Sequence, residues 1–240
     1  MTSTAVTSLS EKSLEKNSLR TLALPGPAGR LEALLNEGAP DAQFVGLVCH
    51  PHPKGGGNMH NKVVYHAMKV LNAPEWNLRW PVLRFNFRGT GTSEGQHDGH
   101  AESADVVAAI HWLHAEFKLP IILVGFSFGA ATAIAASNAL SALSAPTDRP
   151  DLRALALLGL PTHGFKRSYQ YPLLSTCTLP KLFLSGDQDQ FATKQQLEHA
   201  VDSAAEPKTL VFIPDADHFF TGHLEQTQKA LVAWLKEQIR

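Results

Sequence analysis

Short, almost continuously apolar segments alternate along this chain with stretches of helical pattern. The strand-like segments are residues 43–49, 82–87, 121–125, 155–159, 181–185 and 209–213. The helix-like segments are residues 58–71, 104–117, 127–140, 194–203 and 224–239. Strands that are apolar throughout are covered on both faces, and strands that alternate with helices form parallel sheets. The order of segments therefore predicts an α/β fold, in which a mostly parallel sheet carries helices on both faces.

The 240 residues suit one large domain, which we place at residues 18–240. Residues 19–24 and 30–35 flank a Pro- and Gly-rich turn and predict a leading hairpin. Residues 1–17 are rich in Ser, Thr, Lys and Glu and are interpreted as a flexible N-terminal tail. They lack the apolar stretch of a secretory signal, and no run of about 18 apolar residues follows them. We therefore expect a cytoplasmic protein.

The charge balance of the chain argues against polyanionic partners. Its formal net charge is -1 and 18% of its residues are charged. Proteins that bind nucleic acid or anionic membranes carry clustered excess Lys and Arg, so neither partner is expected. Two distant cysteines, Cys49 and Cys177, do not make a disulfide framework. The composition favours a small or uncharged substrate and a reducing compartment.

One strand-like segment leads directly into a serine between two glycines. Residues 121–125 are followed by Gly125-Phe126-Ser127-Phe128-Gly129 and then by an Ala-rich helical stretch. A serine at a sharp strand-to-helix turn projects its hydroxyl above the sheet, and small neighbours prevent clashes at that turn. The helix N-terminus behind it favours negative charge. The segment predicts that Ser127 is a nucleophile, although an ordinary Gly-rich turn would share part of the pattern.

A serine nucleophile needs a base and an acid that orients the base. His218 directly follows the last predicted strand and is expected at the same sheet edge as Ser127. Its nearest rival, His223, is expected to begin the last helix. Asp189 lies in the loop beyond residues 181–185, whereas Asp187 is closer to the strand and is expected to brace the turn. The order Ser127, Asp189, His218 is typical of hydrolases with this kind of turn.

An oxyanion hole must also stabilise the charge that develops during attack on a carbonyl. The backbone N–H of Phe128 is the first expected donor. The second should come from the loop at residues 49–58, whose two prolines have no N–H to donate. His52, Lys54 and Gly55 remain, and we favour His52.

Other interpretations of the Gly-rich loops are weaker. His50 and His52 are spaced like a metal pair, but no third ligand lies nearby in the sequence, so no metal is expected. Residues 84–95 carry glycines spaced as in a nucleotide loop, yet no helix start follows them. We expect a tight turn there, which Arg88, Ser93 and Glu94 fix near the site.

The ordered motifs resemble those of a known family. They are His50-Pro-His-Pro-x-Gly-Gly with Met59, Asn61, Lys62 and Val63, then Arg84-Phe-Asn-Phe-Arg-Gly-x-Gly-x-Ser-x-Gly95, Gly125-Phe-Ser-Phe-Gly129 and Asp217-His218-Phe-Phe. Over residues 19–240 the chain resembles a small, lidless branch of the α/β-hydrolase superfamily, related to dienelactone hydrolases. The resemblance implies an eight-stranded, mostly parallel sheet with its second strand antiparallel. It also implies esterase-type activity, often without an assigned natural substrate.

Two features depart from the resemblance. Dienelactone hydrolases use a cysteine nucleophile where this chain has Ser127, which argues against dienelactones as substrates. Gln190, Phe191 and Ala192 after Asp189 replace the hydrophobic-Pro pair usual in the family.

These observations predict a serine hydrolase that forms an acyl-enzyme on Ser127 and acts on small carboxylic esters, without a metal or organic cofactor. The short connection at residues 162–178 allows a small cover and predicts an open site. A thioesterase, an acyltransferase or a small peptidase would use the same triad. A non-catalytic binding protein with this fold is an alternative of another class.

Overall fold

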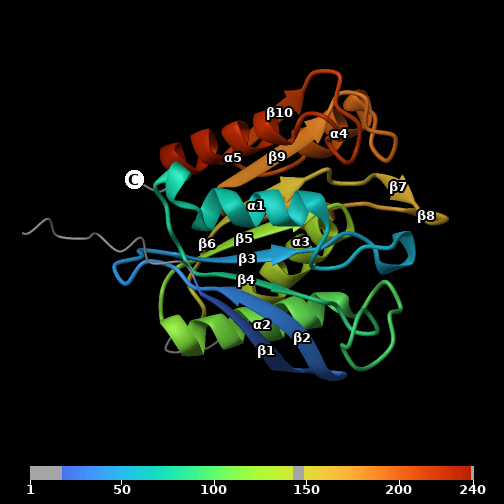
Figure 1. The fold of residues 1–240 in the computed structure, drawn as a ribbon. Coiled ribbons are helices and arrows are strands. Elements are labelled where there is room, and N and C mark those ends of the chain that lie inside the picture. The colour runs from blue at the N-terminus through green and yellow to red at the C-terminus, as the bar shows by residue number, and fades with distance from the viewer. Residues whose placement is uncertain (1–17, 143–148, 239–240) are drawn as a thin grey trace, which may run out of the picture.

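The computed structural model describes residues 18–142 and 149–238, which form an eight-stranded sheet flanked by helices (Figure 1). The order of strands across the sheet is β1-β2-β4-β3-β5-β6-β9-β10. The strands are β1 (Leu19–Gly26), β2 (Gly29–Asn36), β3 (Val45–Cys49), β4 (Val82–Phe85), β5 (Ile121–Phe126), β6 (Leu152–Leu158), β9 (Lys181–Gly186) and β10 (Lys208–Ile213). The tail predicted at residues 1–17 lies outside the described residues.

The direction of each strand follows the prediction. β2 is antiparallel to both β1 and β4, while the pairs from β4 to β10 are all parallel. The predicted hairpin is therefore confirmed, and so is the mostly parallel sheet with an antiparallel second strand. β6 begins three residues earlier than predicted, because residues 152–154 already pair with β5.

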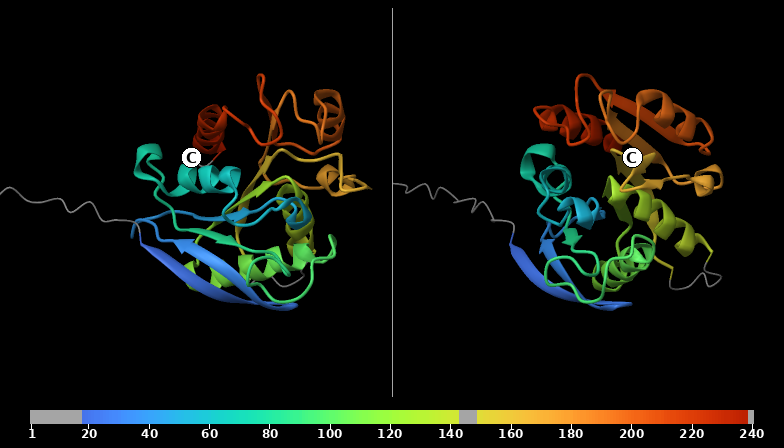
Figure 2. Two further views of the ribbon diagram at one scale, coloured as in Figure 1. Left: turned by 45° about the vertical axis from the view of Figure 1, so that its right-hand side comes forward. Right: turned by 90° about the vertical axis from the view of Figure 1, so that its right-hand side faces the viewer.

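Helices cover both faces of the sheet, as predicted (Figure 2). The α-helices of the described residues are α1 (Lys62–Asn72), α2 (Glu102–Phe117), α3 (Phe128–Ser141), α4 (Lys194–Asp202) and α5 (Leu224–Gln238). Helix α1 starts four residues later than predicted, because the Asn61 side chain caps it by accepting from the N–H of Val63. Among the described residues, no helix is long and apolar enough to cross a membrane.

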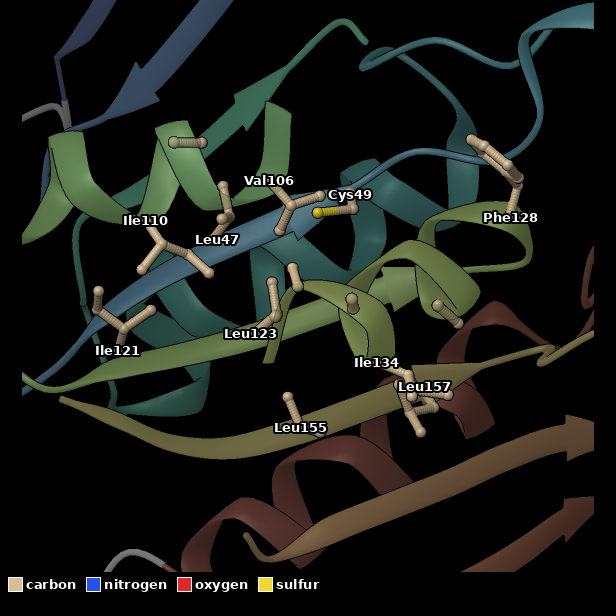
Figure 3. Close-up of a cluster of buried hydrophobic side chains, with 14 of the residues drawn as sticks. Leu47, Cys49, Val106, Ile110, Ile121, Leu123, Phe128, Ile134, Leu155 and Leu157 are labelled. Atoms are coloured by element: carbon tan, nitrogen blue, oxygen red, sulfur yellow. The ribbon is translucent and has the colours of Figure 1, made fainter. Parts of the chain in front are cut away.

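Two apolar cores hold the layers together. One joins the sheet to α2, α3 and α4, and the other joins it to α1 and α5. Figure 3 shows part of the first core, where Leu47 and Leu123 of the sheet meet Val106 and Ile110 of α2. These side chains are fully buried, and each contributes about 1.5–3 kcal/mol by leaving water. The sheet is therefore a rigid base for the loops at its edge.

The strand order places a crevice at one position on the sheet edge. From β3 the chain moves to β4 on one side, whereas β5 pairs with the other side of β3 and leads on to β6, β9 and β10. Ligands of open α/β sheets bind beyond the carboxyl ends of the strands where the order reverses. The loops after β3 and β5, which contain His52 and Ser127, meet at this position.

The connection from β6 to β9 forms a small cover. It contains the hairpin of β7 (His163–Gly164) and β8 (Arg167–Ser168), followed by the 3₁₀-helix η3 (Pro172–Ser175). The hairpin projects beyond the carboxyl ends of the strands, at the right of Figure 1. Its turn residues, Phe165 and Lys166, both have positive φ, as the favoured two-residue hairpin turn requires. The chain therefore has a short strap near the site and, in its described part, no lid domain.

Candidate active site

Ser127 lies at the sharp turn between β5 and α3. Its backbone angles, φ 56° and ψ -119°, fall in a region that non-glycine residues rarely adopt. The N–H of Ser127 donates to the carbonyl of Leu158 at 2.8 Å, which ties the turn to β6. Such strain persists only where the surroundings impose it, and it projects the hydroxyl above the sheet edge.

The two glycines of the turn allow close backbone approach. A Cβ at Gly125 would lie 2.3 Å from the carbonyl oxygen of Gly129. A Cβ at Gly129 would lie 2.4 Å from the carbonyl oxygen of Cys49 and 2.7 Å from that of His50. The glycines thus bring the start of α3 against the end of β3, where the second loop of the site begins.

Replacing Gly129 by alanine should therefore destabilise the protein, although alanine is the better helix former. We expect Gly129→Ala to lower the free energy of unfolding by about 1–3 kcal/mol, as for other overpacked sites. Urea denaturation followed by circular dichroism would measure it. Ala139→Ser is the control, since Ala139 lies on the same helix, α3, with its side chain exposed. Equal losses in the two variants would contradict the steric explanation.

The structure brings Ser127, His218 and Asp189 together in a hydrogen-bonded chain. His218 Nε2 lies 2.9 Å from Ser127 Oγ, and His218 Nδ1 lies 2.8 Å from Asp189 Oδ2. Because a carboxylate only accepts, Nδ1 carries the proton and Nε2 accepts from the serine hydroxyl. Ser127, His218 and Asp189 are 9%, 2% and 4% exposed, so the chain is shielded from bulk water.

Asp189 is fixed by more contacts than the sequence reveals. Its Oδ1 accepts from the backbone N–H groups of Phe191 and Ala192, at 2.7 and 3.2 Å. Its Oδ2 also accepts from the hydroxyl of Ser185 at 3.1 Å. The side chain of Gln190 accepts from the N–H of His218 at 3.3 Å. The residues after Asp189 thus hold both the acid and the base, without the hydrophobic-Pro pair usual in the family.

The rival residues have other contacts. Asp187 Oδ1 accepts from the N–H of Asp215 at 2.8 Å, so its carboxylate braces the neighbouring loop. His223 immediately precedes α5, and its Nδ1 lies 2.9 Å from the carbonyl oxygen of Thr221. Neither side chain contacts Ser127 or His218. The geometry favours Asp189 and His218 over both.

The two residues expected to supply the oxyanion donors are in contact through their rings. The ring centroids of His52 and Phe128 are 4.8 Å apart. The N–H of Lys54 donates to the His52 ring at 3.2 Å, and the N–H of Gly55 donates to the His52 carbonyl at 3.0 Å. Within residues 18–142 and 149–238, the N–H groups of His52 and Phe128 have no hydrogen-bond acceptor. These two groups are therefore available to a ligand, whereas those of Lys54 and Gly55 are engaged.

His50 is a brace between β3 and β4. Its Nε2 accepts from the N–H of Phe87 at 3.0 Å, so its Nδ1 carries the proton and donates to the carbonyl of Pro51 at 2.7 Å. Burial lowers the pKa of His50 to about 3, so the folded state keeps it neutral. Among the described residues, no group of three or more His, Cys, Asp and Glu could hold a metal ion.

The buried His50 should make stability depend on pH. Its pKa is about 6.5 when unfolded and about 3 when folded, so the unfolded state binds more protons between these values. The free energy of unfolding should fall on acidification below about pH 6.5, by up to about 1.4 kcal/mol per pH unit from this residue. Denaturant titrations at several pH values would measure it. The free energy of unfolding should depend less steeply on pH in His50→Gln than in the wild type, and as steeply in the control His100→Gln. Equal slopes in the wild type and both variants would contradict the assignment of this effect to His50.

A pocket opens beside Ser127 under the β7–β8 hairpin. Its volume is about 60 Å³, enough for only a few water molecules. Five Phe and Tyr side chains line it: Phe128, Phe165, Tyr169, Phe191 and Phe219. None of its described lining residues is Asp, Glu, Lys or Arg. The β7–β8 hairpin thus forms the small cover that the short connection allows, and its residues His163, Gly164 and Phe165 line one side of the pocket.

The cover residues could not be identified from the sequence. Phe165, at the tip of the hairpin, contacts the ring of His52 with a centroid distance of 4.2 Å. Arg167 donates a hydrogen bond to the carbonyl of Gly99, which fastens the hairpin to the loop after β4. The paired Phe165 and Lys166 lack the Gly or Asn that usually marks such a turn.

The loop at residues 84–95 is pinned by the three residues expected to do so. Ser93 donates to the carbonyl of Asn86 and accepts from the N–H of Glu32 in β2. Glu94 accepts from the N–H of Arg30 at 2.7 Å. Arg88 ties the same loop to α2: its backbone N–H donates to the carboxylate of Asp105 at 3.0 Å, and its guanidinium forms a buried ion pair with that carboxylate at 2.6 Å.

Cys49 takes no part in the site. It ends β3 and is fully buried in the core shared with α2 and α3 (Figure 3). Burial raises the pKa of its thiol well above the usual range. A thiolate nucleophile like that of dienelactone hydrolases is therefore not supplied by this residue.

Comparisons with known proteins identify the fold family. A family model described as an alpha/beta hydrolase domain matches residues 48–238. An uncharacterised protein of Rickettsia prowazekii is 32% identical over 221 residues, which are 88% of this chain and 86% of that protein. A solved structure from Xanthomonas campestris, described as an α/β serine hydrolase without a lid, is 30% identical with a TM-score of 0.75, covering 92% of this chain and 95% of that one.

A second solved structure points the same way. An α/β serine hydrolase homologue from Coxiella burnetii is 31% identical with a TM-score of 0.73, and the match covers 89% of this chain and 96% of that one. Since the family model spans most of the chain and the sheet and its connections agree, this chain belongs to the α/β-hydrolase family.

Proposed function

We propose that the protein is a serine hydrolase that cleaves small, uncharged carboxylic esters through an acyl-enzyme on Ser127. The observation that carries the proposal is the chain of contacts from Ser127 Oγ to His218 at 2.9 Å and from His218 to Asp189 at 2.8 Å. The α/β-hydrolase fold supports a hydrolase, and the strained turn at Ser127 presents its hydroxyl to the pocket.

The chemistry proceeds in two acyl transfers. His218 takes the proton of Ser127 as its oxygen attacks the ester carbonyl, and Asp189 stabilises the resulting imidazolium. The N–H groups of Phe128 and His52 bind the oxyanion of the tetrahedral intermediate. His218 then gives its proton to the departing alcohol, and a water molecule that it activates releases the acid from Ser127.

The pocket supports a short, uncharged acyl group. A carboxylate on the substrate would need a cationic partner in this poorly hydrated space, and none of the described lining residues is Lys or Arg. The volume of about 60 Å³ also leaves little room for a long chain.

Labelling with a fluorophosphonate probe tests the proposal. The probe should add one equivalent to the native protein, and peptide mass spectrometry should locate it on Ser127. Heat-denatured protein is the control, because labelling depends on the folded site. Absence of labelling, or labelling at another residue, would overturn the proposed nucleophile.

A substrate panel separates ester hydrolysis from the other activities that the same triad supports. Aryl acetates and butyrates, acyl-CoA thioesters and aminoacyl amides should be compared by kcat/KM. We expect the short aryl esters to give the highest values. Preference for thioesters or amides would reassign the substrate, and stoichiometric binding without turnover of any of them would favour a non-catalytic protein.

A further inference from the structure

A buried histidine outside the proposed triad contacts both residues that offer oxyanion donors. His97 lies in the loop between β4 and α2, and its side chain is 7% exposed. Its ring is edge-on to the ring of His52, with centroids 4.7 Å apart, and edge-on to the ring of Phe128, at 5.5 Å. In the proposed mechanism this side chain neither donates nor accepts a proton.

A buried carboxylate holds His97 in this position. Nδ1 of His97 lies 2.6 Å from Oε1 of Glu102, the first residue of α2, whose side chain is 0% exposed. The same oxygen accepts from the N–H groups of Asp98 and Gly99, at 3.0 and 3.1 Å. The start of α2 therefore fixes the ring through Glu102.

Hydrogen bonding alone does not account for a histidine at position 97. Within the described residues, neither of its ring nitrogens has a hydrogen-bond partner of suitable alignment, although Nδ1 lies 2.6 Å from Glu102 Oε1. A buried polar atom without such a partner is destabilising. The contacts of the ring with its aromatic neighbours are the remaining feature that distinguishes this position.

Hydrogen bonds of the loop restrain His52 through its carbonyl, which accepts from the N–H groups of Gly55 and Gly57, and through its ring, which accepts from that of Lys54. The residues on both sides of it are prolines, which have no N–H to donate. Its ring lies between His97 and Phe165, and Phe165 belongs to the exposed hairpin. Loss of the His97 ring would leave a void beside His52 and Phe128, into which either side chain could move together with its backbone N–H.

We propose that His97, fixed by Glu102, is a positioning residue of the oxyanion hole. This inference rests on the proposed function, because it concerns the N–H groups of His52 and Phe128 during ester cleavage. The ring acts by its shape: it holds the two donors at the spacing that the tetrahedral intermediate requires. Small displacements of such donors are costly, since they act on charge that develops only in the transition state.

The test compares four variants on one short aryl ester. His97→Ala should lower kcat by about 10- to 100-fold and change KM by less than about threefold. His97→Phe, which retains a flat ring, should recover most of the lost kcat. Glu102→Gln should fall between the wild type and His97→Ala. His100→Ala is the matched control, because this exposed histidine lies in the same loop and should behave as wild type.

A second readout separates positioning from a general loss of structure. An alkyl boronic acid forms a tetrahedral adduct with the serine, so its affinity should fall by the same factor as kcat in His97→Ala. Thermal unfolding of each variant would confirm that the assays are made on folded protein. If His97→Ala does not fold, Glu102→Gln keeps the ring and must still lower kcat and boronate affinity.

The outcomes distinguish this inference from the proposed function. Unchanged kcat in His97→Ala, or a His97→Phe variant as impaired as His97→Ala, would overturn the positioning role while the wild-type enzyme stays active. A wild-type protein that neither reacts with the fluorophosphonate nor hydrolyses esters would overturn the proposed function, and the inference with it.

Discussion

Replacing Ser127 by alanine should reduce ester hydrolysis by about 10⁴- to 10⁶-fold, the loss typical of serine hydrolases without their nucleophile. The reason is that no other hydroxyl contacts Nε2 of His218 among the described residues, so no group can replace the acyl acceptor. The steady-state rate on a short aryl ester and the extent of fluorophosphonate labelling would measure the effect. The free energy of unfolding should change little, because the hydroxyl contributes a single hydrogen bond at the surface of the pocket.

Ser137→Ala provides the matched control for this result. Ser137 is on the same helix, α3, and its buried hydroxyl donates to the carbonyl of Ile134 at 2.8 Å. This variant should keep the wild-type rate while it loses a comparable hydrogen bond. Full activity in Ser127→Ala would refute the acyl-enzyme on this residue.

The sequence predicted the fold well because strand order and helix order leave a local signature. The core strands are mostly apolar, and β3, β4, β5 and β9 are each followed by an α-helix that leads to the next parallel strand. Parallel strands also place their carboxyl ends at one edge, so Ser127, Asp189 and His218 could be assigned to one site before any coordinates were known. Their contacts at 2.9 and 2.8 Å have the geometry that this assignment requires.

The surroundings of the site could not be predicted in the same way. Phe165 contacts His52, more than a hundred residues away in the sequence, and Arg167 contacts Gly99. Because these partners are far apart in the sequence, no local pattern predicts either contact. His97 was equally hidden, since a histidine in a polar loop gives no sign that it will be buried. These features depend on how loops from different strands pack, which the periodicity of the individual strands and helices does not encode.

The second oxyanion donor is a point at which the structure adds information that the sequence does not contain. Sequence reasoning removed the two prolines of the loop and left His52, Lys54 and Gly55, of which it favoured His52. Hydrogen bonding within the folded loop then engages the N–H groups of Lys54 and Gly55 and leaves that of His52 available. The N–H groups of Lys54 and Gly55 both donate to His52 because the compact Gly-rich loop turns back on itself at this point.

Asp189→Asn should lower kcat by about 10⁴-fold with little change in KM. The amide that replaces the carboxylate can donate a proton toward Nδ1 of His218, which favours the tautomer with its proton on Nε2. His218 would then lack the lone pair that accepts the proton of Ser127. Steady-state kinetics on the same aryl ester would measure the loss, and fluorophosphonate labelling should slow by a similar factor.

Asp187→Asn is the matched control, because Asp187 lies two residues away and its carboxylate accepts from the N–H of Asp215 instead of His218. The asparagine oxygen can still accept that hydrogen bond, so this variant should stay within about threefold of the wild-type rate. A larger loss in Asp187→Asn than in Asp189→Asn would exchange the roles of the two carboxylates. Comparable small losses in both would instead mean that His218 needs no buried acid, and the two-step mechanism would then rest on Ser127 and His218 alone.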